Sequence, residues 1–172
     1  MIRKYFFLIF YRCFAQYLPL SGKCPFAKKI RYLCAKNIFK HCGENVNIER
    51  KAYFGTGFDL SIGDNSGLGV NCKVPSDITI GENVLMGPNC YIFSKSTHEF
   101  SRTDIPIRLQ GRKISNKKTI IEDDVWIGRD VLINHGRKVS TGTIIAARSV
   151  VTKDYPAYTI IGGNPAKLIR SR

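Results

Sequence analysis

Long hydrophobic runs are absent from this sequence. Nowhere do about 18 uncharged apolar residues follow one another, so no transmembrane helix is expected. Histidine is scarce, with three in 172 residues, and the three are widely dispersed. None of the six cysteines forms the C-x-x-C pair that is typical of a zinc site. We therefore expect no metal, and scattered cysteines that stay reduced, as in a cytoplasmic protein.

Acidic side chains are absent from residues 1–42, which contain nine basic ones. Residues 43–172 contain the other 18 basic residues and all 13 acidic ones, so most of the net charge of +14 belongs to the N-terminal segment. A charge of this size suggests nucleic-acid binding. Because the rest of the chain has no recognised nucleic-acid motif, we do not expect nucleic acid as a partner.

Residues 1–41 form a basic, aromatic segment that we expect to be helical. Residues 1–20 begin like an export signal, but Arg12 interrupts the apolar run and no small-residue cleavage site follows, so export is not expected. Phe6, Phe10 and Phe14 recur near helical spacing beside cationic residues, which is typical of a helix lying on a membrane surface. The alternative is that the segment packs on the body of the protein with its lysines facing water.

From Cys42 onward an aliphatic residue recurs every six positions, a period that fits neither a helix nor simple alternation. Glycine often follows the aliphatic residue, as at Gly63, Gly69, Gly81 and Gly87. The two unbroken frames are Ile62, Leu68, Val74, Ile80, Met86 and Ile92, and then Ile121, Ile127, Ile133, Val139, Ile145 and Val151.

A six-residue period of this kind predicts a solenoid. Each hexad supplies a short strand with its aliphatic residue pointing inward and then a turn, and the stacked coils bury a column that no single hexad can bury. We expect the glycines at turns with positive φ, a conformation that costs little only without a Cβ. With three hexads to a coil, the chain has room for about five coils.

Residues 42–170 resemble the hexapeptide-repeat acyltransferases, closest to the maltose and galactoside acetyltransferase and capsule O-acetyltransferase branches. The resemblance rests on CGENVNIERKAYFGTGFDLSIGDNSGLG, IGENVLMGPNCYI, THEF, IEDDVWIGRDVLI and SVVTKDYPAYTIIGGNPAKLIR. It implies a mainly β protein, with a left-handed parallel β-helix over residues 42–172 after the N-terminal helical segment, and a short C-terminal helix. It also implies a homotrimer that uses acetyl-CoA as cosubstrate in sites shared between subunits.

The repeat lapses between Ile92 and Ile121, which leaves an extended loop at about residues 93–120. Loops of this length in a compact protein are usually functional or disordered. This one contains His98, and in the resembled family the loop reaches the neighbouring subunit and supplies the catalytic base. Imidazole, with an ordinary pKa of about 6.5, suits that role near neutral pH. We interpret His41 and His135 as structural.

The resemblance also assigns residues to the acetyl-CoA site, and three arginines depart from its pattern. Arg129 and Arg148 replace small residues, while Arg137 occupies an inward position usually held by Val. A buried, unpaired guanidinium is costly, so Arg137 must reach solvent or a partner. The expected cosubstrate contacts are Trp126, Arg129, Ala147, Thr152, Lys153, Lys167 and Arg170.

Together these features predict an enzyme that moves an acetyl group from acetyl-CoA to a sugar hydroxyl of a surface polysaccharide or its precursor, with His98 as general base. The sugar-binding set of the maltose and galactoside branch is not present, since Gly57 and Pro75 stand at its polar positions. One alternative is a xenobiotic or amino-sugar N-acetyltransferase, and another is a catalytically silent trimeric scaffold. We expect a cytoplasmic protein with peripheral contact to the inner face of the membrane through its N-terminal segment.

Overall fold

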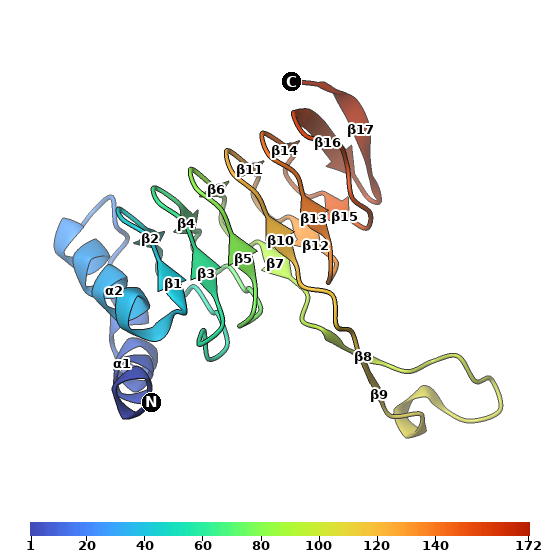
Figure 1. Cartoon of the computed structure of the whole chain (residues 1–172), viewed down its shortest axis with the longest axis horizontal. Coiled ribbons are helices and arrows are strands. Elements are labelled where there is room, and N and C mark those ends of the chain that lie inside the picture. The colour runs from blue at the N-terminus through green and yellow to red at the C-terminus, as the bar shows by residue number, and fades with distance from the viewer.

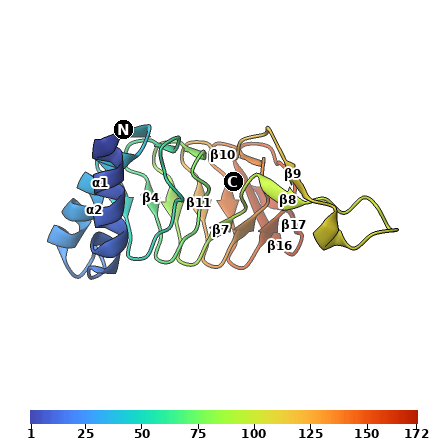
Figure 2. The ribbon, with the colours of Figure 1, turned by 90° about the horizontal axis from the view of Figure 1, so that it is seen from below.

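The computed structural model describes residues 1–172, and most of the chain winds into a parallel β-helix with three faces (Figures 1 and 2). The first face is a five-stranded sheet that takes one strand from each coil, so the five predicted coils are confirmed. Its strands are β1 (His41–Cys42), β3 (Ser61–Ile62), β5 (Thr79–Ile80), β10 (Ile120–Ile121) and β13 (Lys138–Val139).

The other two faces are built in the same way, and the second face has a sixth strand, which follows the fifth coil. The second face is continuous from coil to coil, since the N–H of Gly67 donates to the carbonyl of Val84 at 3.1 Å. Its strands are β2 (Asn47–Ile48), β4 (Gly67–Leu68), β6 (Leu85–Met86), β11 (Trp126–Ile127), β14 (Ile144–Ile145) and β16 (Thr159–Gly163). The third face begins with single-residue bridges and then has the strands β7 (Tyr91–Ile92), β12 (Leu132–Ile133) and β15 (Val150–Val151).

The aliphatic residues of the hexads fill the inside of the β-helix, as predicted. Each stacks on its equivalent in the next coil, as Ile127 does on Ile145, and both are buried. Of the two frames, only Met86 is half-buried. The column is therefore continuous, and each coil stabilises its neighbours by removing apolar surface from water.

The corners of the coils differ from the prediction in which residues take positive φ. Asn and Asp have this conformation there, for example Asn65 (φ 56°), Asn83 (φ 57°) and Asp124 (φ 55°). The glycines that follow the aliphatic residues do not. A Cβ at Gly69 would instead lie 2.2 Å from the carbonyl oxygen of Gly87. The prediction that these glycines are needed for positive φ was therefore wrong. They are needed because adjacent coils approach too closely there to leave room for a side chain.

Helices cover the N-terminal end of the β-helix (Figure 1). They are α1 (Ile2–Cys13), the 3₁₀ helix η1 (Ala15–Tyr17) and α2 (Pro25–Ile38). Leu8 and Tyr11 of α1 and Ile38 of α2 belong to the same hydrophobic cluster as the β-helix core, so the segment packs on the body. None of the helices has the length and apolarity that crossing a membrane requires.

The C-terminal end is an antiparallel β-hairpin, and the expected short C-terminal helix was wrong. Strand β16 pairs with β17 (Ala166–Ser171), and Gly163 and Pro165 lie at the turn between them. Thr159, Ile160 and Ile161 are β-branched and favour a strand. Ile161 is buried, pairs with Ile145 and so extends the aliphatic column to the end of the molecule.

Candidate active site

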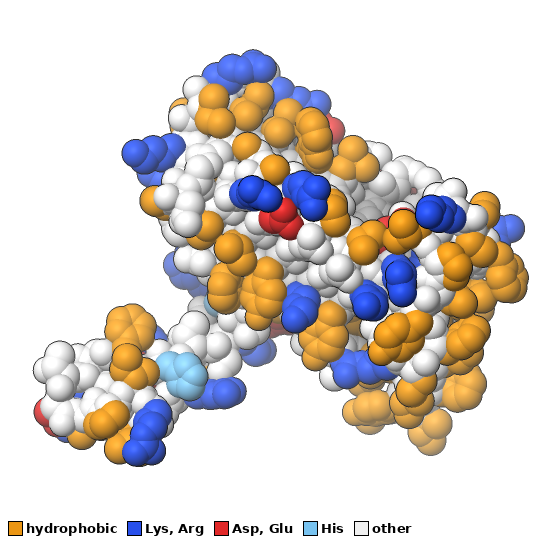
Figure 3. All heavy atoms as spheres, turned by 180° about the vertical axis from the view of Figure 1, so that it is seen from behind, with side chains coloured by type: hydrophobic (Ala, Val, Ile, Leu, Met, Phe, Trp, Pro, Cys, Tyr) orange, Lys and Arg blue, Asp and Glu red, His pale blue; other side chains and the backbone are white.

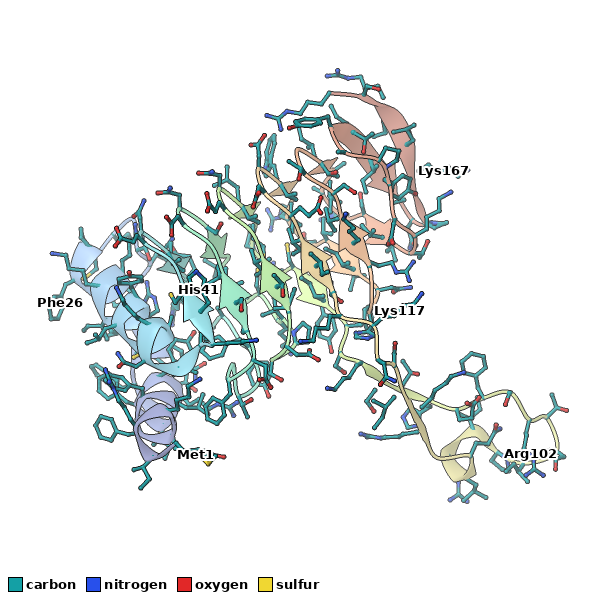
Figure 4. All side chains as sticks on the ribbon, in the orientation of Figure 1. Met1, Phe26, His41, Arg102, Lys117 and Lys167 are labelled. Carbon is teal, nitrogen blue, oxygen red and sulfur yellow. The ribbon has the colours of Figure 1, made fainter.

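The loop between the third and fourth coils leaves the body as a β-hairpin. It departs at Phe93, whose N–H donates to Ile133 at 3.0 Å, and returns at the buried Thr119. Between them, β8 (Ser96–His98) pairs with β9 (Arg112–Ile114), and the 3₁₀ helix η2 (Ile107–Leu109) lies farther out. Figure 4 shows the hairpin extending away from the β-helix to the region of Arg102. Because none of residues 93–118 is buried, the hairpin adds nothing to the core.

His98 is the last residue of β8 and lies opposite Arg112. Its imidazole is exposed and forms no hydrogen bond within the chain. The adjacent Glu99 does not orient it. The Glu99 carboxylate instead accepts the N–H groups of Phe100 at 2.9 Å and Ser101 at 3.1 Å, and these bonds lower the pKa of Glu99. The imidazole is thus available to a group brought by another molecule.

Three of the seven predicted cosubstrate residues line one groove of about 460 Å³ on the second face. Trp126 comes from β11, Arg129 from the corner after it, and Ala147 from the same corner one coil later. Trp126 is 56% exposed, so its ring forms a wall of the groove and not part of the core. A Cβ at Gly128 would lie 2.6 Å from the backbone nitrogen of Ala147, so the floor of the groove is closely packed backbone.

The other four predicted residues lie outside this groove. Thr152 and Lys153 follow β15 at the corner between the third and first faces, where the Lys153 ammonium lies 5.5 Å from the centre of the Tyr155 ring. Lys167 and Arg170 are exposed on β17, in the same sheet as the groove strands β11 and β14. Neither cation is paired with an acid. The structure therefore places the cations of β17 in the same sheet as the groove, but it leaves Thr152 and Lys153 at a different corner of the β-helix.

Asp130 pairs with two of the arginines that depart from the family pattern. Its carboxylate lies 3.2 Å from Nε of Arg129 and 3.7 Å from Nε of Arg148. A hydrogen bond from Asn89, together with these two guanidinium groups, lowers the pKa of Asp130. Both cations are consequently held beside the groove, where the phosphate of a ligand would add a second anionic partner.

Arg137 reaches a partner, which is one of the two outcomes that the sequence predicts. Its Nη1 lies 3.5 Å from the carboxylate of Asp154 and donates to the carbonyl of Thr152 at 3.5 Å. Nearby in sequence, both ring nitrogens of His135 are buried without a hydrogen-bond partner, whereas His41 is exposed. Neither of these histidines lines a groove with the predicted site residues.

A pocket of about 340 Å³ on the third face was missed by the sequence analysis. It is lined by Tyr53, Lys73 and Tyr91, which bridge to one another across successive coils, and by Lys95 at the base of the hairpin. Lys95 pairs with Asp77 at 3.3 Å, whereas Lys73 has no acidic partner. The sequence does contain a signal for this pocket. Each of the three bridging residues precedes an inward residue, so each points outward, and they recur once per coil.

Comparisons with known proteins agree with this architecture. The family profile "Bacterial transferase hexapeptide (six repeats)" matches residues 59–94. The galactoside O-acetyltransferase of Escherichia coli K12 is 34% identical over 138 residues, covering 78% of this chain and 65% of the relative. A chloramphenicol acetyltransferase of Escherichia coli is 52% identical over 54 residues, covering 31% of this chain and 26% of the relative. The chain thus spans less than two thirds of the length of these relatives.

Two solved structures are similar over most of the chain. A hexapeptide-repeat acetyltransferase from Vibrio cholerae O1 biovar eltor, complexed with acetyl-CoA, has a TM-score of 0.70 and 33% identity, covering 82% of this chain and 75% of that one. A galactoside acetyltransferase in complex with CoA has a TM-score of 0.78 and 30% identity, covering 99% of this chain and 79% of that one. With its five coils and continuous aliphatic column, the chain belongs to the bacterial hexapeptide-repeat transferase family.

Proposed function

We propose that the protein transfers the acetyl group of acetyl-CoA to the hydroxyl of a sugar, a unit of a surface polysaccharide or of its precursor. The observation that supports this most is the open groove of Trp126, Arg129 and Ala147 on a chain that also presents an exposed imidazole on a projecting hairpin. The relatives named galactoside acetyltransferase, one of them solved with CoA, point to the same chemistry.

The groove fits coenzyme A by its chemistry. Trp126, Ile144 and Ala147 offer apolar surface to an aliphatic arm, and Lys167 and Arg170 on β17 offer cations to phosphates. When bound, acetyl-CoA supplies a thioester that is activated toward acyl transfer. Thr152 and Lys153 belong to the same proposal as contacts from a neighbouring subunit, because they lie outside the groove of their own chain.

His98 acts as the general base in this proposal. Its imidazole accepts the proton of the acceptor hydroxyl while the oxygen attacks the thioester carbonyl, and backbone N–H groups stabilise the resulting oxyanion. The tetrahedral intermediate then collapses, the C–S bond breaks, and the imidazolium returns the proton to the departing thiolate. The reaction needs no covalent acyl-enzyme and no further reactant.

A homotrimer completes this site. Within a single chain His98 is not part of the groove that Trp126 lines, and its hairpin extends away from the body (Figure 4). A second subunit placed against the groove would bring its own hairpin to the thioester. The pocket of Tyr53, Lys73 and Tyr91, next to the base of the hairpin, is the corresponding candidate for the acceptor.

An N-acetyltransferase is the second candidate function, and the match to chloramphenicol acetyltransferase keeps a xenobiotic acceptor in the comparison. The acceptor class is decided by turnover with neutral sugars, acidic sugars, amino sugars and chloramphenicol. Acetyl-CoA and CoA should be separated by chromatography, because the exposed Cys13 and the half-buried Cys24 and Cys42 would react with a thiol dye. Faster turnover of an amine or of chloramphenicol than of any sugar would contradict O-acetylation of a sugar.

The catalytic assignment is tested by His98→Ala, which we expect to lower kcat by about 10²–10⁴-fold. The matched control is His41→Ala, another exposed histidine, which should leave turnover unchanged. Ala147→Trp should raise the KM for acetyl-CoA, because the exposed Ala147 lines the groove and a large ring would fill it. Equal turnover by wild type and His98→Ala would exclude His98 as the base, and no turnover with any acceptor would favour a silent scaffold.

A further inference from the structure

Helix α1 has apolar side chains on two opposite faces, and only one of them is covered. The inner face places Leu8 and Tyr11 in the core, where the Tyr11 hydroxyl donates to the carbonyl of Ala52 at 2.7 Å. A helix that is hydrophobic all round is usually buried on every side. On the outer face only Tyr5, at its edge, packs on the body, with its ring centre 5.0 Å from that of Phe58. The rest of that face lacks the partner that its composition predicts.

The outer face of α1 is a row of exposed apolar residues. Ile2, Phe6 and Ile9 follow one another at helical spacing and are 87%, 65% and 62% exposed. Tyr5 and Phe10 flank the row and are also exposed. Figure 3 shows hydrophobic side chains gathered at the end of the molecule formed by the N-terminal helices, with Lys and Arg among them. We call Ile2, Tyr5, Phe6, Ile9 and Phe10 the α1 apolar face.

The α1 apolar face is surrounded by cations that have no acidic partner. By helical spacing, Arg3 and Arg12 stand on either side of the row. In the whole segment of residues 1–42 only the buried Arg31 forms an ion pair, with Glu49. The exposed cations are Arg3, Arg12, Lys23, Lys29, Lys36 and Lys40.

We propose that the α1 apolar face inserts into the surface of an anionic bilayer while the surrounding cations contact its headgroups. At 12 residues, α1 is shorter than the roughly 20 that span a membrane, and its inner face is already bound to the core, so it lies in the plane of the interface. A second copy of the chain is a poorer occupant, because pairing this face with itself would bring two uncompensated cationic clusters together. The proposal does not depend on the acetyltransferase reaction.

Flotation of the full-length protein with lipid vesicles tests this docking. The wild type should float with vesicles of phosphatidylcholine and phosphatidylglycerol, bind much less to phosphatidylcholine alone, and dissociate as salt is raised. The double variant Phe6→Ser, Ile9→Ser removes two exposed side chains and should bind about tenfold or more weakly. Its matched control is Leu168→Ser, Ile169→Ser, which removes exposed apolar residues from β17 at the opposite end of the molecule and should bind like the wild type.

Two further readouts separate docking from folding and assembly. Circular dichroism of the Phe6→Ser, Ile9→Ser variant should match the wild type, because both positions are exposed, and light scattering should give the same mass. The proposal is overturned if the variant floats as well as the wild type, or if the wild type binds neutral vesicles as well as anionic ones. A smaller mass of the variant would also overturn it, because that result would show that another copy of the chain covers the α1 apolar face in the wild type. Acetyl-CoA turnover with a soluble acceptor serves as a separate measurement that the variant should leave unchanged.

Discussion

At the scale of single residues, Arg31 joins the helical segment to the first coil. Its fully buried guanidinium donates to the carbonyls of Ile48 at 2.6 Å and Pro19 at 2.9 Å, and Nη2 lies 3.7 Å from the Glu49 carboxylate. We expect Arg31→Met to lower the free energy of unfolding by about 3–5 kcal/mol, because it leaves these oxygens and a half-buried charge without their donor. Urea unfolding followed by circular dichroism measures the change.

The control and the pH dependence identify the cause of this loss. Lys29→Met replaces an exposed cation of the same helix and should change stability by no more than about 0.5 kcal/mol. Burial raises the pKa of Glu49, but hydrogen bonds from Asn47 and Ser21 outweigh it and lower the pKa. The stability that the Glu49 charge provides is therefore complete above its ordinary pKa of about 4.3 and is lost as pH falls through the lower folded value. The Asn47 and Ser21 hydrogen bonds remain in Arg31→Met, so the two proteins differ in the attraction between Arg31 and Glu49, which protonation of Glu49 removes from the wild type. The difference in the free energy of unfolding between wild type and Arg31→Met should therefore narrow as pH falls, and a constant difference would argue against the ion pair.

Single-residue predictions from the sequence succeed where a position repeats and fail where contacts are unique. The inward positions, such as Ile127 and Ile145, recur every six residues, so their burial is readable from the period. The partners of Arg31 come from separate segments that the period does not connect. The lapse in the repeat predicts that His98 lies on an exposed loop. It does not predict which groups contact the imidazole, because a single chain offers it no partner.

At the scale of elements, each corner of the β-helix needs a residue that tolerates positive φ. Arg148 occupies such a corner with φ 60°, where Asn71 and Asn89 stand in earlier coils. The left-handed conformation costs an ordinary residue more than it costs Asn, so Arg148→Asn should raise the free energy of unfolding by about 0.5–1 kcal/mol. The ion pair that it removes, with Asp130 at 3.7 Å, joins a side chain that is 83% exposed and offsets little of this gain. Arg50→Asn, at an exposed corner residue without positive φ, should give no gain in the same unfolding measurement.

Elements were predicted best where local chemistry and the repeat agree. The strands and the N-terminal helices follow from their own residue spacing. The C-terminal helix was expected from resemblance alone, whereas the β-branched residues Thr159, Ile160 and Ile161 favour the strand that forms. The hairpin of β8 and β9 has no hexad pattern and no buried residue, so the sequence gives its position but not its shape.

At the scale of the whole molecule, the proposed site needs parts of two subunits, and mixing inactive variants can test this. His98→Ala lacks the base but retains the groove. Ala147→Trp retains the base but has an obstructed groove, and it is inactive when acetyl-CoA is kept far below its raised KM, the condition used for the assay. If each site takes its hairpin from one subunit and its groove from the next, random heterotrimers of the two variants should have about a quarter of their sites intact. Coexpression should therefore recover about a quarter of wild-type turnover, with light scattering giving three times the chain mass. A site contained within one chain recovers nothing on mixing, because every chain has one defect, and that result would contradict the shared site.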